Sequence, residues 1–168
     1  MNTETIKLKK QIRYMLLFFM VALAFSGATA IPVEEELRAV LPHLNAEGAI
    51  AQLLQEVYNA VVLVRRQYPF LMYGYDWLAF AHFVIAVAFI GPFKDPVRNI
   101  WVIEFGMIAC VMVLPFALVF SAYRGLPFWW SLIDCSFGVF GILPLWYCHR
   151  KIKQLERLTA FDKLNLVF

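Results

Sequence analysis

The sequence predicts an all-α membrane protein, a four-transmembrane-helix bundle with a small external helical segment between the first two helices. The residues are 62% hydrophobic, whereas an ordinary soluble domain is roughly 45–50% apolar. Charged residues make up only 16% of the chain, and they are concentrated at the ends of four long apolar runs. Because so much apolar surface suits a lipid solvent better than water, we expect residues 1–168 to form a single integral membrane domain.

The first apolar run covers residues 14–31, and basic residues precede it. A basic start, an apolar stretch and Ala28-Thr29-Ala30 near its end are also typical of a cleaved signal peptide. However, its 18 residues are about the minimum length that spans a bilayer. We therefore expect this first helix to stay attached to the protein.

Three further apolar runs of 21 residues each are too long for strands, and we predict transmembrane helices over residues 70–90, 101–121 and 128–148. Aromatic pairs stand at both ends of the last run, Trp129-Trp130 and Trp146-Tyr147, as in the aromatic belts at membrane interfaces. Residues 149–168 follow as a basic tail that we expect to lie along the inner membrane surface.

Residues 32–69 form the one sizeable segment between predicted membrane helices. Pro32 and the three glutamates after it favour a helix start, because proline fits the first turn and acids suit the positive end of the helix dipole. A second helix is predicted after Asn45, where apolar residues follow helical spacing: Ile50, Leu53, Leu54, Val57, Val61 and Val64. We expect this face to pack on the bundle or to lie on the membrane.

The basic residues predict the orientation, because cytoplasmic loops carry an excess of Lys and Arg. Of the 15 Lys and Arg residues, 11 lie in the N-terminal segment, the loop after the second membrane helix or the C-terminal tail: Lys7, Lys9, Lys10, Arg13, Lys94, Arg98, Arg150, Lys151, Lys153, Arg157 and Lys163. The other side keeps Arg38, Arg65, Arg66 and Arg124. We therefore expect a protein of the cell (inner) membrane with both termini in the cytoplasm.

Four ionisable residues lie inside the predicted membrane helices: Asp76, His82, Glu104 and Asp134. Each costs on the order of 2.5–3.5 kcal/mol at the bilayer centre, so such residues usually face the bundle interior. At a rise of 1.5 Å per residue, Asp76 and Asp134 each lie about 9 Å in from the outer end of their helices. Both carboxylates are therefore predicted at one level.

Each of three helices has a stripe of small residues that predicts a packing face, because small side chains allow another helix to approach closely. The stripes are Ser131, Asp134, Gly138, Gly141 and Leu145; Asp76, Ala79, Phe83, Ala86 and Ile90; and Ala22, Ser26 and Thr29. Asp76 and Asp134 then point inward, within reach of Arg124, Arg65 or Arg66. One interpretation is a buried ion-pair network that holds the helix register. Another is an outward-facing polar pocket, and a third is simple exposure of the carboxylates at the level of the lipid head groups.

The polar pocket predicts a binding site for a lipid or a small amphipathic molecule, with the residues Ser26, Thr29, Asp76, His82, Arg124 and Asp134. A lone histidine such as His82 is more often a hydrogen-bonded packing residue than a ligand. At the inner face, a second polar cluster is expected from Arg98, Glu104 and His149. In the loop before the predicted helix over residues 101–121, Asp95 and Asn99 are two alternative positions for a helix start.

Three functions fit these residues: a lipid-binding or accessory protein of a membrane complex, a membrane-embedded enzyme that uses acid/base chemistry on a lipid-like substrate, and a small transporter subunit. Cys110, Cys135 and Cys148 have neither CxxC spacing nor a nearby histidine cluster, so we expect no metal site. No cofactor motif is present, and haem would need a second histidine at a suitable depth. The expected partners are membrane lipids and either further copies of this chain or a larger membrane complex, but no nucleic acid.

Overall fold

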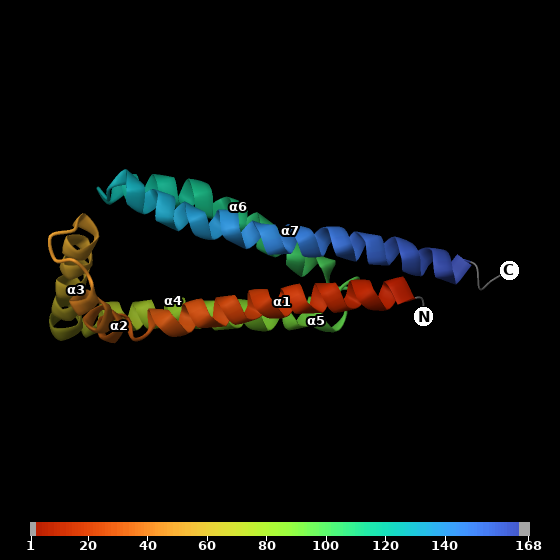
Figure 1. The fold of residues 1–168 in the computed structure, drawn as a ribbon, viewed down its shortest axis with the longest axis horizontal. Helices are drawn as coiled ribbons and strands as arrows, with labels where there is room; N and C mark the ends of the chain where they lie inside the picture. The colour runs from red at the N-terminus through yellow and green to blue at the C-terminus, as the bar shows by residue number, and fades with distance from the viewer. Residues whose placement is uncertain (1–2, 165–168) are drawn as a thin grey trace. The chain divides into compact units, whose positions relative to one another are not determined.

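The structure is a computed structural model that describes the backbone of residues 3–164 and the side chains of residues 3–160. In this part of the chain every regular element is helical (Figure 1): α1 (Thr3–Ala30), α2 (Val33–Val40), the 3-10 helix η1 (Leu41–His43), α3 (Ala49–Gln67), α4 (Pro69–Ala88), α5 (Ile90–Lys94), α6 (Ile100–Tyr123) and α7 (Phe128–Leu164).

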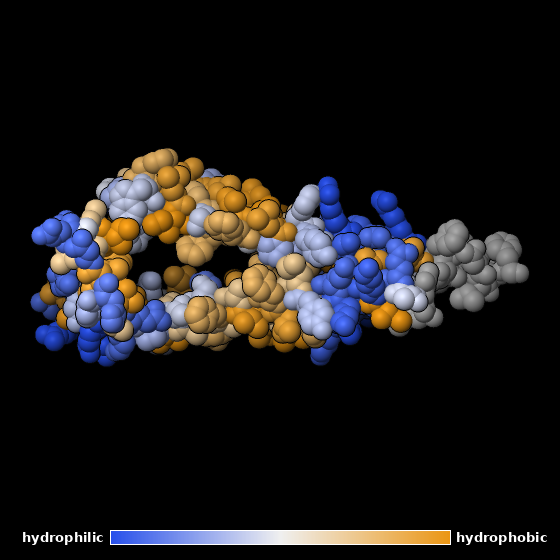
Figure 2. Space-filling model, viewed as in Figure 1, coloured by the Kyte–Doolittle hydropathy of each residue, from blue (hydrophilic) through white to orange (hydrophobic). Residues whose placement is uncertain are grey.

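Four helical segments are long and apolar enough to cross a membrane: Thr3–Ala30, Pro69–Lys94, Ile100–Tyr123 and Phe128–Ala160. Figure 2 shows hydrophobic side chains along these helices, and hydrophilic ones gathered over α2 and α3 and towards the chain termini on α1 and α7. The predicted fold class, an all-helical chain with four membrane-spanning helices, is confirmed. These four helices indicate a multi-pass membrane protein.

The chain forms two compact units. The first combines Met1–Met20 with Val87–Phe168, and the second is Val21–Ala86. The long helices α1 and α4 each contribute to both units, since the division falls within them. Each unit is described separately below.

In the first unit, α6 and α7 lie side by side and pack through the predicted stripe of α7 (Figure 1). A Cβ atom on Gly138 would lie 2.5 Å from the backbone oxygen of Cys110, and one on Gly141 would lie 3.0 Å from the sulfur of the same residue. Leu145 is fully buried. The predicted packing face of α7 is therefore confirmed, and only glycine fits where the two backbones come closest.

The predicted transmembrane helix 128–148 does not end at Cys148, because α7 continues to Leu164. The expected basic tail is thus the last part of one long helix. Ile152 and Leu155 are fully buried and continue the apolar spacing beyond Cys148. On α1, the buried residues Leu8, Ile12 and Leu16 also recur every four residues, and Gln154 donates a hydrogen bond to Glu4. The apolar faces of α1 and α7 thus continue beyond the predicted membrane-spanning segments.

In the second unit, the predicted external helical segment is present as α2, η1 and α3. The predicted helix start is confirmed, since α2 begins at Val33 directly after Pro32, but Pro32 is the N-cap of the helix and not a residue of its first turn. On α3, Ala51 is buried, but Ile50 is 72% exposed within this structure. The predicted apolar face of α3 therefore begins one residue later than expected.

Gly27 makes the close contact between α1 and α4 in the second unit. A Cβ atom there would lie 2.8 Å from the backbone oxygen of Ala79 and 2.9 Å from Cβ of His82. Ala79 is fully buried, as the stripe on its helix predicted. Ala22 and Ser26 are exposed, so the face expected for the first helix is wrong by about one residue of rotation. A residue without a side chain approaches α4 more closely than serine does.

Candidate functional site

The first unit contains a groove of about 700 Å³ along one face of α6. Its apolar lining comes from α6 residues spaced mostly three or four apart, as expected for one side of a helix: Phe105, Ala109, Met112, Val113, Phe116, Ala117 and Phe120. The remaining lining residues are Ser121 near the end of α6, Arg124 and Leu126 in the turn that follows, and Asp134 on α7. The groove is therefore apolar along its length and polar at one end.

Two of the predicted ligand residues, Arg124 and Asp134, line this polar end together. No hydrogen bond or ion pair joins Asp134 to any residue in the described part of the chain, although it is only half-exposed. The guanidinium carbon of Arg124 lies 5.6 Å from the ring centre of Tyr123. Beside them, the hydroxyls of Ser121 and Ser131 share a buried hydrogen bond of 2.5 Å. The cation and the carboxylate thus face one groove with their charges available to a ligand.

The other four predicted ligand residues belong to the second unit. Thr29 donates a hydrogen bond of 3.2 Å to the backbone oxygen of Ser26. Nδ1 of His82 lies 2.9 Å from the backbone oxygen of Leu78, and the half-buried ring has the character of a packing residue. Asp76 is exposed. That Asp76 shares a site with Asp134 stays a prediction.

At the predicted inner-face cluster, Nε2 of His149 on α7 lies 3.2 Å from a carboxylate oxygen of Glu104 on α6. Arg98 makes no contact of this kind with them. Instead its backbone N–H donates to the Asp95 carboxylate in the loop before α6. Asn99 is the N-cap of α6, and its side-chain amide donates to the backbone oxygens of Gly91 and Asp95. The loop residues therefore hold the end of α5 in place.

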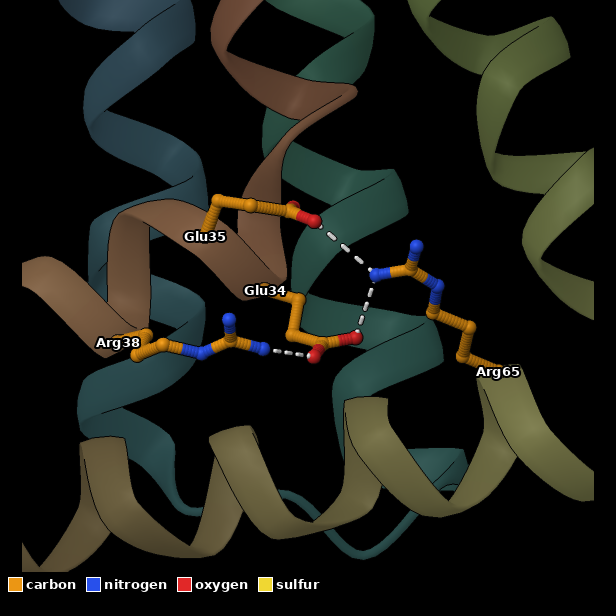
Figure 3. Close-up of polar contacts among 4 residues, drawn as sticks. All are labelled: Glu34, Glu35, Arg38 and Arg65. Carbon is orange, nitrogen blue, oxygen red and sulfur yellow. Dashed lines mark hydrogen bonds and ion pairs between the residues drawn. The ribbon is translucent and has the colours of Figure 1, made fainter.

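A further polar cluster, which was not predicted from the sequence, joins α2 to α3 (Figure 3). The carboxylate of Glu34 accepts hydrogen bonds of 2.6 Å from Arg38 and 2.8 Å from Arg65, and Glu35 accepts one of 3.0 Å from Arg65. Glu34 is buried between the two guanidinium groups. We call these four residues the α2–α3 clamp. The Glu34–Arg38 pair has helical spacing and is visible in the sequence, but the contact with Arg65 spans 31 residues.

Arg65 was one of the arginines expected near Asp76 and Asp134, and the clamp accounts for its charge instead. Hydrogen bonds to Glu34 and Glu35 raise the pKa of Arg65. Hydrogen bonds from its own backbone N–H and from Arg65 lower the pKa of Glu35, because both favour the ionised carboxylate. The clamp is an ionic connection that holds the two short helices together.

Among the described residues, no three His, Cys, Asp or Glu side chains are grouped so that they could hold a metal ion. Cys110, Cys135 and Cys148 are free thiols. No family model, curated protein or solved structure matches this chain.

Proposed function

We propose that this protein binds an amphipathic molecule, a lipid or a lipid-like compound, in the groove along α6. The observation that carries this proposal is the apolar groove that ends at Arg124 and at Asp134, an aspartate without an ion-pair partner in the part of the chain that the structure describes. A buried or half-buried charge normally has a partner, because leaving it without one is costly. The head group of a bound amphiphile would supply that partner.

The size of the groove suits such a ligand. Its volume of about 700 Å³ falls within the range of roughly 300–1,000 Å³ that small-molecule sites occupy. Phe105 and Arg124 are separated by about 28 Å along the helix axis at 1.5 Å per residue, close to the roughly 30 Å of a bilayer's hydrocarbon core. An acyl chain of the outer leaflet therefore lies along the part of the apolar lining nearest Arg124, and its head reaches the membrane interface.

The charges at the polar end favour a head group that carries both signs. Arg124 would receive a phosphate, because a guanidinium forms paired hydrogen bonds to phosphate oxygens. Asp134 would accept hydrogen bonds from an amine or hydroxyl of the same head group. A phospholipid with a primary amine, such as phosphatidylethanolamine, meets both requirements.

The orientation belongs to the same proposal. We infer that the chain lies in the cell (inner) membrane with both termini in the cytoplasm. The reason is that 11 of its 15 Lys and Arg residues lie in the N-terminal segment, the loop after the second membrane helix or the C-terminal segment. The turn that carries Arg124 then lies on the outer side. The ligand head would be held in the outer leaflet.

Native mass spectrometry of the protein extracted with its lipids tests the proposal. The wild type should retain phosphatidylethanolamine, and Ala109→Phe should reduce the retained fraction at least tenfold, because the new ring fills the groove. Ala122→Phe is the matched control: Ala122 is also exposed on α6 but does not line the groove. Equal retention by the two variants, or no retained lipid in the wild type, would contradict the proposal.

A further inference from the structure

A second pocket, of about 430 Å³, lies near the start of α1 in the first unit. Three of its lining residues are cations, Lys9, Lys10 and Arg13, and none is acidic. The apolar lining includes Tyr14 and Leu17 of α1 and Phe93 of α5. This cationic pocket differs from the groove along α6 in its residues, its helices and the sign of its charge.

The three cations of the pocket have no carboxylate partner. In the described part of the chain, Lys9, Lys10 and Arg13 form no ion pair. Two of them lie near aromatic rings: Nζ of Lys10 is 5.7 Å from the ring centre of Tyr14, and Cζ of Arg13 is 5.9 Å from that of Phe93. An exposed cation–π contact of this length is weak, so the pocket keeps the charge to attract an anion.

The basic surface of α7 provides a comparison. Another pocket there is lined by His149, Arg150, Lys153 and Arg157. In it, His149 lies against Glu104, Lys153 pairs with a glutamate, and Arg150 stacks on a tryptophan at 3.8 Å. Three of the four basic side chains that line this pocket are therefore already engaged. The pocket on α1 is the more available anion site of the two.

The order of residues along α1 indicates what kind of anion fits. Lys9, Lys10 and Arg13 directly precede the apolar run that starts at Tyr14, so in a membrane they lie at the level of the lipid head groups. Leu17 lies about 6 Å deeper than Arg13 along the helix axis, at the level of the acyl chains. The cations and the apolar wall are thus stacked in the same order as the phosphate and chains of a phospholipid.

We propose that this pocket binds an anionic phospholipid, whose phosphate lies among Lys9, Lys10 and Arg13 and whose acyl chain lies against Tyr14 and Phe93. The charge complementarity decides the choice of lipid, because three cations without an acid favour net negative charge over a zwitterionic head group. This inference needs the chain to be in a membrane, but it does not depend on the ligand proposed for the groove along α6.

The test measures phosphatidylglycerol and phosphatidylcholine bound to the full-length protein in detergent, by native mass spectrometry. Each basic residue near an anionic membrane surface contributes about a fivefold factor in affinity, so Lys9→Gln, Lys10→Gln and Arg13→Gln together should weaken phosphatidylglycerol binding by roughly a hundredfold. The single variant Arg13→Gln should lose about fivefold. Phosphatidylcholine binding should stay within twofold in every variant.

The matched control removes the same number of charges from α7, with Lys151→Gln, Lys153→Gln and Arg157→Gln. It should retain phosphatidylglycerol within threefold of the wild type. Equal losses in the control and the α1 variant would mean diffuse attraction to the basic end of the protein and would overturn the site. Equal wild-type affinity for the two lipids would also overturn it. If the triple α1 variant does not fold by circular dichroism, unchanged binding in Arg13→Gln decides against the proposal.

Discussion

Replacing Gly138 by alanine tests the packing of α6 against α7. The new Cβ would lie 2.5 Å from the backbone oxygen of Cys110 and 3.3 Å from Cβ of Val113. Because a backbone atom cannot turn aside as the end of a side chain can, the two helices have to separate by several tenths of an ångström. Overpacking of this kind costs about 1–3 kcal/mol. Replacing a helical glycine by alanine also yields about 0.5–1 kcal/mol, which offsets part of the loss.

Gly74 on α4 is the matched control, because a Cβ atom there meets nothing within 4 Å. Gly74→Ala keeps only the gain in helix propensity, so the difference between the two variants isolates the steric cost of about 1–3 kcal/mol. Gly106→Ala should fall between them, since the atoms nearest its new Cβ are the side-chain ends of Leu145 and Phe89.

Unfolding of the purified protein in detergent, followed by circular dichroism against added denaturant, measures these differences. Gly138→Ala should unfold earlier than the wild type, and Gly74→Ala at the same point or later. If Gly138→Ala and Gly74→Ala were equally stable, α6 and α7 would not pack through this glycine, and the close approach described above would be refuted.

Three further predictions address the topology, the carboxylates and the clamp. Single cysteines at Gln55 and Gln154, in a background without the native cysteines, should react with an impermeant reagent from opposite sides of the membrane; labelling from one side would contradict the orientation. Asp76→Asn and Asp134→Asn should show a coupling of roughly 0.5–3 kcal/mol in a double-mutant cycle if they share a site, whereas additive effects would separate them. Because the pKa of Glu35 is lowered on folding, its contribution to stability is present above about pH 4.3 and is lost as the pH falls through the folded pKa. Unfolding measured from pH 7 to pH 3 should therefore be less pH-dependent in Glu35→Gln, and identical profiles would count against the clamp.

Length and apolarity alone were sufficient to predict the four long helices. A run of about 20 apolar residues can satisfy its backbone hydrogen bonds in lipid only as a helix, so no tertiary contact is needed for that conclusion. The packing face of α7 was also predictable, because the small residues Gly138 and Gly141 lie on the same stripe as Leu145. The helical start after Pro32 followed from local chemistry in the same way. These features depend on neighbours within one or two turns.

Contacts between distant residues were decided only by the tertiary structure. From the sequence, Arg65 was expected near the carboxylates of Asp76 and Asp134. In the structure it donates hydrogen bonds to Glu34 and Glu35 instead, and only the positions of α2 and α3 decide between these partners. Gly27 rather than Ser26 approaches α4. The sequence could not distinguish the two, because a rotation of the helix by one residue leaves the composition of the packing stripe almost unchanged. That Arg124 and Asp134 line one groove was likewise decided by the way α6 and α7 pack together, since the two residues come from different parts of the helical hairpin. Helical periodicity specifies the face of a helix, but the partner of each face depends on energies of packing between segments far apart in the chain.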